Sequence, residues 1–280
     1  MAERPFPRGR STVRDPRTVV ARVGEHLNGH RDQDRRLRAV EAEVRDVLRG
    51  GGPRIVFQPI VDLRNGDVVG LEALSRFTGS HRPPLAWFEA ARQVGLGCEL
   101  ELLALRRARA ACAAADGIFL AVNLSPETLV SPAFLELLDG EDHRLVIEAT
   151  EHAPVHDYDA LARPLRTIKE KGARLAVDDA GAGFASLRHV LRLAPDLIKL
   201  DIELTRQIDS DRAKRALAAG LIAFAEELPA TIVAEGIETR EQLDELRELG
   251  VTLGQGFYLC PPSTIGDIDP EAVAERAVDR

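Results

Sequence analysis

The chain has 280 residues, a length that suits one α/β barrel as well as two smaller domains. Its formal net charge of -8 argues against binding to nucleic acid polymers or acidic membranes, although residues 1–50 alone are basic. Three scattered cysteines and the lack of an apolar run of roughly 18 residues predict a cytoplasmic protein without membrane insertion.

The first part of the chain divides in two. Residues 1–33 are rich in Arg, Pro and Gly with weak periodicity, so we expect a flexible basic extension with one short helix near Val19–Leu27. From Asp34 to Arg49 apolar residues recur at three- and four-residue spacing, which predicts an amphipathic helix ended by a Gly-rich turn. We assign residues 34–280 to one barrel domain that this helix helps to close.

Two strands joined by a hairpin follow the glycines. Ile55–Val61 and Val68–Leu74 are strand-like runs, and Asn65-Gly66 lies between them. Asn-Gly between two such runs is the strongest short hairpin signal. The first two strands are therefore expected to be antiparallel.

The remainder alternates helices with strands. The expected helices are Leu85–Val94, Glu99–Ala115, Pro132–Leu138, Tyr158–Lys171, Leu187–Leu193, Arg212–Leu228 and Arg240–Leu249. The expected strands are Ile118–Asn123, Leu145–Ala149, Arg174–Asp178, Asp196–Asp201, Thr231–Glu235 and Thr252–Phe257. Eight strands in this rhythm predict an α/β fold, a TIM-like (β/α)8 barrel variant with the first strand antiparallel to the rest. The sequence contains no Gly-rich phosphate loop of the Rossmann or P-loop type, which argues against both of those folds.

Polar residues interrupt or end each of the seven parallel strands near its carboxyl end. They are Glu72, Asn123, Glu148, Asp178 with Asp179, Lys199 with Asp201, Glu235, and Gln255. Buried parallel strands are otherwise nearly continuous apolar runs. Barrel active sites are assembled at this edge from several strands, so we expect these side chains to converge.

The residue types indicate divalent metal ions. Carboxylates crowded at one edge repel one another unless cations neutralise them. Oxygen donors without Cys or His favour Mg²⁺ or Mn²⁺ over Zn²⁺. We expect Glu72, Asn123, Glu148 and Asp178 to hold one ion, and Asp178 to share a second with Asp179.

Two such ions, about 3.5–4 Å apart, suit phosphodiester hydrolysis. Lys199 is expected to orient the attacking water or to stabilise charge on the phosphate. Glu235 is the candidate for the base that positions this water, and it is also a candidate ligand of the second ion.

Eight motifs in order carry a family resemblance. They are Gln58-Pro59-Ile60, Glu72-Ala73-Leu74 with Arg76, Asn123-Leu124-Ser125-Pro126, Glu148-Ala149-Thr150-Glu151, Asp178-Asp179, Lys199-Leu200-Asp201, Glu235-Gly236-Ile237-Glu238 and Gln255-Gly256. From roughly Arg35 to Pro262 the chain resembles the EAL domain, the bacterial phosphodiesterase that cleaves cyclic di-GMP to linear pGpG.

The resemblance implies the metal ligands named above and adds residues around the substrate. Gln58, Leu74, Arg76 and Gln255 are expected to face the dinucleotide, Arg76 through a phosphate, and Asp201 is included with them. The resemblance further implies a homodimer. Glu151 is expected to brace the loop after the fifth strand, where family members often dimerise. Glu238 is left out of the site as a partner of the following helix.

Two departures from the family pattern leave a second function open. The loop reads Asp178-Asp179-Ala180-Gly181-Ala182-Gly183 where the family has Phe and Thr, and Cys260-Pro261-Pro262 replaces Gly-Arg-Pro. A cyclic di-GMP receptor or interaction module without turnover is therefore the alternative to an active enzyme. A barrel glycoside hydrolase using two carboxylates is a third reading. One Trp and two Tyr leave little to stack against a sugar.

Overall fold

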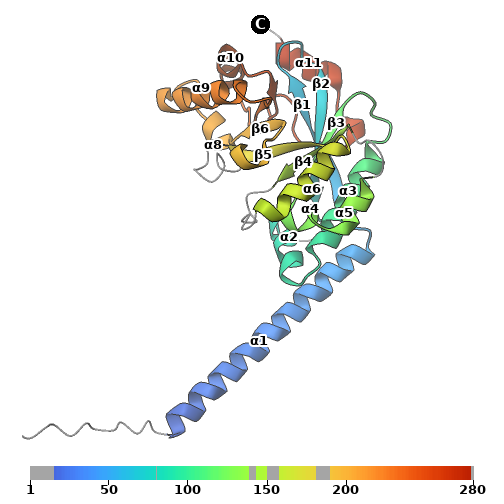
Figure 1. Ribbon diagram of the computed structural model, residues 1–280, viewed down its shortest axis with the longest axis vertical. Helices are drawn as coiled ribbons and strands as arrows, with labels where there is room; N and C mark the ends of the chain where they lie inside the picture. Colours follow the sequence, from blue (N-terminus) through green and yellow to red (C-terminus); the bar gives the residue numbers. More distant parts are fainter. Residues whose placement is uncertain (1–15, 80, 139–142, 150–157, 181–189, 279–280) are drawn as a thin grey trace, which may run out of the picture.

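Eight strands close into a barrel in chain order in the computed structural model (Figure 1). The structure describes residues 16–79, 81–138, 143–149, 158–180 and 190–278, with only the backbone for residues 16–32, 158–160 and 179–180. The strands are β1 Arg54–Asp62, β2 Val68–Arg76, β3 Phe119–Leu124, β4 Leu145–Ala149, β5 Arg174–Ala180, β6 Leu197–Leu200, β7 Thr231–Ala234 and β8 Leu253–Gly254. The expected barrel is confirmed.

The reversed first strand is also confirmed. β1 pairs antiparallel with both β2 and β8, and the other neighbouring strands pair in parallel. Gly66 adopts a φ of 82° in the β1–β2 turn, and its backbone N–H donates to the carbonyl of Asp62 at 2.8 Å. Gly tolerates this left-handed conformation without a steric penalty. The Asn65-Gly66 turn thus sends β2 back along β1.

Helices surround the barrel in the described part of the chain. They are α1 Pro16–Arg49, α2 Pro84–Gln93, α3 Gly97–Ala111, α4 Pro126–Leu129, α5 Pro132–Leu137, α6 Tyr158–Glu170, α8 Ile202–Thr205, α9 Arg212–Glu226, α10 Arg240–Glu248 and α11 Pro270–Val278, with a 3₁₀ turn at Ile265–Asp267. Residues 190–193 are helical, and the rest of the helix expected there lies outside the described residues. The sequence did not predict α4, α8 or α11. None of the described helices has the length and apolar character needed to cross a bilayer.

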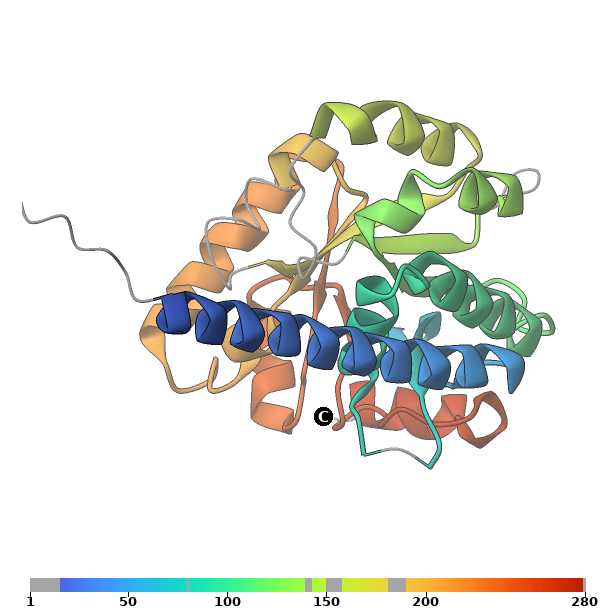
Figure 2. The same ribbon diagram turned by 90° about the horizontal axis from the view of Figure 1, so that it is seen from below.

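The helix α1 differs from expectation because it runs without a break from Pro16 and extends beyond the barrel (Figure 1). Figure 2 shows the same helix from below. Its second half packs on α2 and α3, where Val44 is fully buried in a cluster with Trp87, Ala91 and Leu100. Each Gly within a helical segment costs only about 1 kcal/mol, so neither Gly24 nor Gly29 ends this helix. A domain boundary near residue 33 stays a prediction.

The strand β8 is much shorter than expected. The chain leaves the barrel after Gly254, and the N–H of Ile237 donates to the carbonyl of Gln255 at 3.1 Å. A Cβ on Gly256 would lie 2.1 Å from the carbonyl oxygen of Ile237. This backbone contact with the segment after β7 ends the strand early and places Gln255 at the edge of the barrel.

The barrel interior separates an apolar end from a polar end. Residues from six strands fill the lower interior, namely Ile60, Phe119, Ala121, Val146, Ala176, Leu197 and Val233. The Phe119 ring lies directly over Gly70, where a Cβ would approach it to 2.4 Å. The polar residues expected at the strand ends therefore lie above a closed hydrophobic floor.

Candidate active site

Lys199 lies at the centre of the polar end, surrounded by four carboxylates. Its ammonium nitrogen is 2.7 Å from Glu235, 2.8 Å from Glu148, 3.5 Å from Glu72 and 3.6 Å from Asp178. The five side chains come from β2, β4, β5 and β6 and from the residue after β7. The structure thus brings together five residues that the sequence analysis expected to converge.

Burial makes this cluster electrostatically unusual. It raises the pKa of Glu148 well above the usual range, with a further contribution from Glu72 and an opposing one from Lys199. Burial also raises the pKa of Glu235 to about 8. Burial disfavours the charged form of Lys199, but the surrounding carboxylates outweigh it and hold the Lys199 pKa well above its ordinary value. One buried ammonium thus faces an excess of carboxylates.

Two amide side chains connect to the same carboxylates. Asn123 donates from Nδ2 to Glu72 at 3.1 Å, and Gln255 donates to Glu72 at 2.6 Å and to Glu235 at 3.0 Å. Asn123 also lies opposite Glu148 in the pairing of β3 with β4. The Oε1 atom of Gln255 is buried without a hydrogen-bond partner. Gln255, expected to bind substrate, therefore contacts the carboxylate cluster itself.

The donor set fits divalent cations, although the described residues do not form a ready ligand shell. Within the described ranges, no three His, Cys, Asp or Glu side chains are arranged as a metal site. Lys199 lies between the carboxylates, 2.8 Å from Glu148 and 2.7 Å from Glu235. Carboxylate and amide oxygens are the ligands that Mg²⁺ and Mn²⁺ prefer. The excess negative charge and the unpaired oxygen of Gln255 are consistent with added cations. Glu151 and the side chain of Asp179 lie outside the described atoms, so their roles stay predictions.

Two cavities flank the cluster and share Leu74 and Asp178. One, of about 360 Å³, is lined by Gln58, Glu72, Leu74, Asp178, Lys199, Ile202, Glu235, Gly236, Glu238, Gln255, Gly256 and Phe257. The other, of about 350 Å³, includes Leu74, Arg76, Leu85, Phe88, Glu101, Asn123 and Asp178. The predicted substrate residues thus divide between the two cavities, with Gln58 and Gln255 in one and Arg76 in the other.

The cavities also contain residues that the sequence analysis missed. Ile202 and Phe257 line the first cavity, and Phe257 is 66 % exposed. Glu238, which we had left out of the site, lines the same cavity. The aromatic residue directly after Gln255-Gly256 was the signal in the sequence that pointed to Phe257. Ile202 carried no such signal.

Asp201 has a structural contact of its own. Its carboxylate accepts a hydrogen bond from the N–H of Glu203 at 2.6 Å and caps α8. Asp is a preferred N-cap because it satisfies one of the free N–H groups of the first turn. Contact between Asp201 and substrate stays a prediction.

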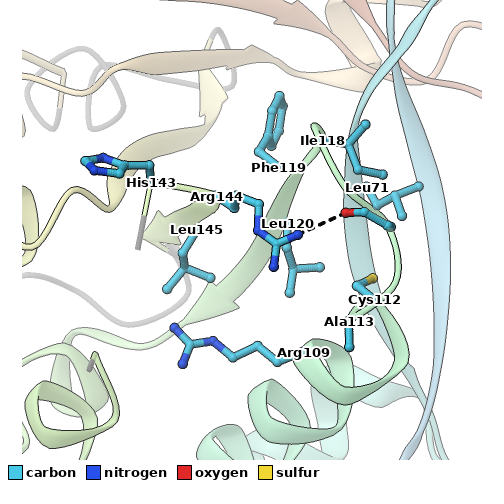
Figure 3. Close-up of a pocket in the computed structure, with 11 residues that line it drawn as sticks. Leu71, Arg109, Cys112, Ala113, Ile118, Phe119, Leu120, His143, Arg144 and Leu145 are labelled. Atoms are coloured by element: carbon cyan, nitrogen blue, oxygen red, sulfur yellow. Dashed lines mark hydrogen bonds between the residues drawn. The ribbon is translucent and has the colours of Figure 1, made fainter. Parts of the chain in front are cut away.

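A larger cavity, of about 500 Å³, lies at the opposite end of the barrel (Figure 3). It is bordered by the starts of β3 and β4 and by the end of α3, with Arg109 and Arg144 on its walls. Arg109 is partly buried and donates to the carbonyl of Leu137 at 3.1 Å. Residues at the amino ends of barrel strands usually serve stability. This cavity is therefore not the candidate active site.

A barrel with ionisable side chains gathered at the carboxyl ends of its strands has the layout of a barrel enzyme. The family model of the EAL domain matches residues 41–262. The chain therefore belongs to the EAL domain family, as the sequence motifs indicated.

Several named proteins are similar to this chain over most of its length. It is 31% identical over 243 residues to the probable cyclic di-GMP phosphodiesterase PdeG of Escherichia coli K12, covering 81% of this chain and 48% of PdeG. The solved structure of Klebsiella pneumoniae BlrP1 with calcium and cyclic di-GMP is 32% identical, with a TM-score of 0.69 over 76% of this chain and 56% of that one. The PaMucR phosphodiesterase in complex with cyclic di-GMP is 27% identical, with a TM-score of 0.72 over 81% of this chain and 98% of that one.

The chain spans only part of the curated relatives it matches, 48%, 34% and 38% of the length of three of them. Activities, substrates and partners of those whole proteins are therefore proposals for this chain. What the comparisons establish is the family and its barrel.

Proposed function

We propose that this chain is a metal-dependent phosphodiesterase that hydrolyses cyclic di-GMP to linear pGpG. The observation that carries the proposal is the cluster of four carboxylates around Lys199, flanked by two cavities. Relatives whose names include cyclic di-GMP phosphodiesterase, and a relative solved with calcium or manganese and cyclic di-GMP, support it.

The metal would be held by oxygen atoms of the cluster. Glu72, Asn123, Glu148 and Asp178 are the proposed ligands of one Mg²⁺ or Mn²⁺ ion, and Asp179 joins Asp178 at a second. Divalent ions supply an acidified water and neutralise charge on the phosphate. The buried carboxylates contribute an anionic, water-poor environment in which such a cation binds strongly.

The remaining residues act on the water and the substrate. Glu235 is proposed to position the water and to take its proton, since burial brings the pKa of its carboxyl to about 8, near the pH at which proton transfer to and from it is balanced. Lys199 keeps its charge and stabilises the negative phosphate oxygens.

The two cavities are proposed to hold the two halves of the dinucleotide, with Leu74 between them. Arg76 is proposed to bind a phosphate, and Gln58, Gln255 and Asp201 to contact the nucleotide. A homodimer supported by Glu151 and a cytoplasmic location complete the proposal.

The test is incubation of the purified chain with cyclic di-GMP and Mg²⁺ or Mn²⁺, followed by chromatography of the products. Appearance of pGpG that Glu72→Ala abolishes and the exposed control Glu271→Ala preserves supports the proposal. Nucleotide binding without pGpG favours instead a receptor or interaction module, the alternative raised by Ala180 and Ala182 in the loop after β5.

A further inference from the structure

Glu101 on α3 is a partly buried carboxylate that belongs to none of the family motifs in the sequence. Its Oε2 atom accepts hydrogen bonds from the backbone N–H of Ser125 at 2.9 Å and from the Ser125 hydroxyl at 3.0 Å. The Thr128 side chain adds a further hydrogen bond, and burial raises the pKa of the Glu101 carboxyl. In the described part of the chain no Lys, Arg or His forms an ion pair with it. Burying a carboxylate without a cation is costly.

The bonds of Glu101 fix the turn that ends β3. Ser125 lies two residues after Asn123, and its hydroxyl also caps α4 by accepting from the N–H of Thr128 at 3.4 Å. Glu101 therefore holds this turn against α3 from 24 residues away in the sequence. Because β3 leads directly into the turn, the position of Ser125 governs the direction of the Asn123 side chain.

The orientation of Asn123 matters for the metal site. Its Nδ2 atom donates to Glu72 at 3.1 Å, which leaves Oδ1 as the atom able to bind a cation. A small rotation of the strand end would break this bond and turn the oxygen away. Charge-assisted hydrogen bonds are roughly twice as strong as neutral ones, so a carboxylate holds the turn more firmly than a neutral residue would.

We propose that Glu101 is a positioning residue of the metal site: by holding Ser125 it keeps the Asn123 oxygen directed at the ion. The inference rests on the proposed function. Glu101 also lines the second cavity, but the inference concerns only its hold on Ser125 and assigns it no contact with the metal. Supporting contacts of metal ligands typically change metal affinity by about 10–100-fold when removed.

The chain offers matched variants. Glu101→Leu removes the acceptor at similar size, and Glu101→Gln keeps one carbonyl oxygen that accepts both bonds from Ser125. Glu99, two residues earlier on the same helix, is exposed, so Glu99→Leu is the control. Asn123→Ala removes the residue through which Glu101 is proposed to act.

The experiment is calorimetric titration of Mn²⁺ into the full chain, with melting temperatures recorded with and without Mn²⁺. Glu101→Leu is expected to weaken Mn²⁺ binding about tenfold, Glu101→Gln to recover most of it, and Glu99→Leu to leave it unchanged. In the Asn123→Ala background, Glu101→Leu is expected to cause no further loss, because the two residues act as one unit.

An unchanged Mn²⁺ affinity in Glu101→Leu, with a lower melting temperature in metal-free protein, overturns the inference and leaves Glu101 a structural brace. The inference is also overturned if Glu101→Leu weakens Mn²⁺ binding as much in the Asn123→Ala background as it does in the wild type. If Glu101→Leu does not fold, Ser125→Ala replaces it in the same comparison. Glu72→Ala separates the two proposals. If Glu72→Ala loses Mn²⁺ binding and Glu101→Leu keeps it, only this inference is rejected. If Glu72→Ala still binds Mn²⁺ like the wild type, the proposed metal site itself is rejected.

Discussion

The ammonium nitrogen of Lys199 lies 2.8 Å from Oε2 of Glu148 inside the barrel, and both side chains are at most 2 % exposed. Three further carboxylates lie within 4 Å of the same nitrogen. Attraction between buried charges is strong because little water screens it. The cluster therefore depends on Lys199 as its internal cation, and divalent ions would relieve the remaining excess of negative charge.

Lys199→Met should destabilise the metal-free protein. Removing one partner of a buried ion pair typically costs about 3–5 kcal/mol, because an uncompensated charge is left behind. Urea unfolding in EDTA and in Mn²⁺ would measure the effect. We expect Mn²⁺ to stabilise the variant more than the wild type, since added cations replace the lost charge. Equal unfolding free energies of variant and wild type in EDTA would show that the ammonium does not hold the cluster together.

Gly70→Ala should destabilise the barrel floor. The added Cβ would lie 2.4 Å from the Phe119 ring, and overpacking of this kind costs about 1–3 kcal/mol. Thermal unfolding of Gly70→Ala, Phe119→Leu and the double variant tests the cause. The loss of stability in the double variant should be smaller than the sum of the losses in the two single variants. Strict additivity would contradict a clash between these two residues.

Val44→Asp should loosen the second half of α1 from the barrel. Val44 is fully buried against α2 and α3, whereas Ala42 on the same helix is exposed. An unpaired carboxylate at Val44 should lower the free energy of unfolding by about 3 kcal/mol or more, and Ala42→Asp should change it little. Denaturant unfolding of the two variants makes the comparison. Similar losses in both would mean that α1 does not dock through Val44.

The Cys112 thiol should resist alkylation in the folded protein. Burial raises its pKa to about 11, so about one thiol in a thousand is ionised at pH 8, and the thiolate is the reactive form. Because the pKa is raised, the reaction should accelerate about tenfold per pH unit up to that value. Iodoacetamide labelling followed by peptide mass spectrometry would measure the rate. Labelling in native protein as fast as in urea would contradict the shifted pKa.

Much of the fold could be predicted because its signals are local. Asn65-Gly66 indicated the reversed first strand, and ionisable residues such as Glu148 and Lys199 stood out at the ends of apolar strands. Their convergence followed from barrel geometry alone.

The rest depends on contacts between distant segments. β8 ends early because Gly256 contacts the backbone of Ile237, and no residue within the strand predicts this contact. Glu101 was missed because its partner Ser125 lies on another element. The central position of Lys199 among the carboxylates is likewise set by tertiary packing.

The most direct test is metal restoration of activity in EDTA-treated protein supplied with cyclic di-GMP. The carboxylate cluster predicts no pGpG in EDTA and recovery on addition of Mn²⁺ in the wild type. Glu148→Gln should remain inactive at every Mn²⁺ concentration, and Glu271→Gln on the exposed side of α11 should recover like the wild type. Recovery in Glu148→Gln equal to wild type, or turnover in EDTA, would contradict a metal-dependent phosphodiesterase built on this cluster.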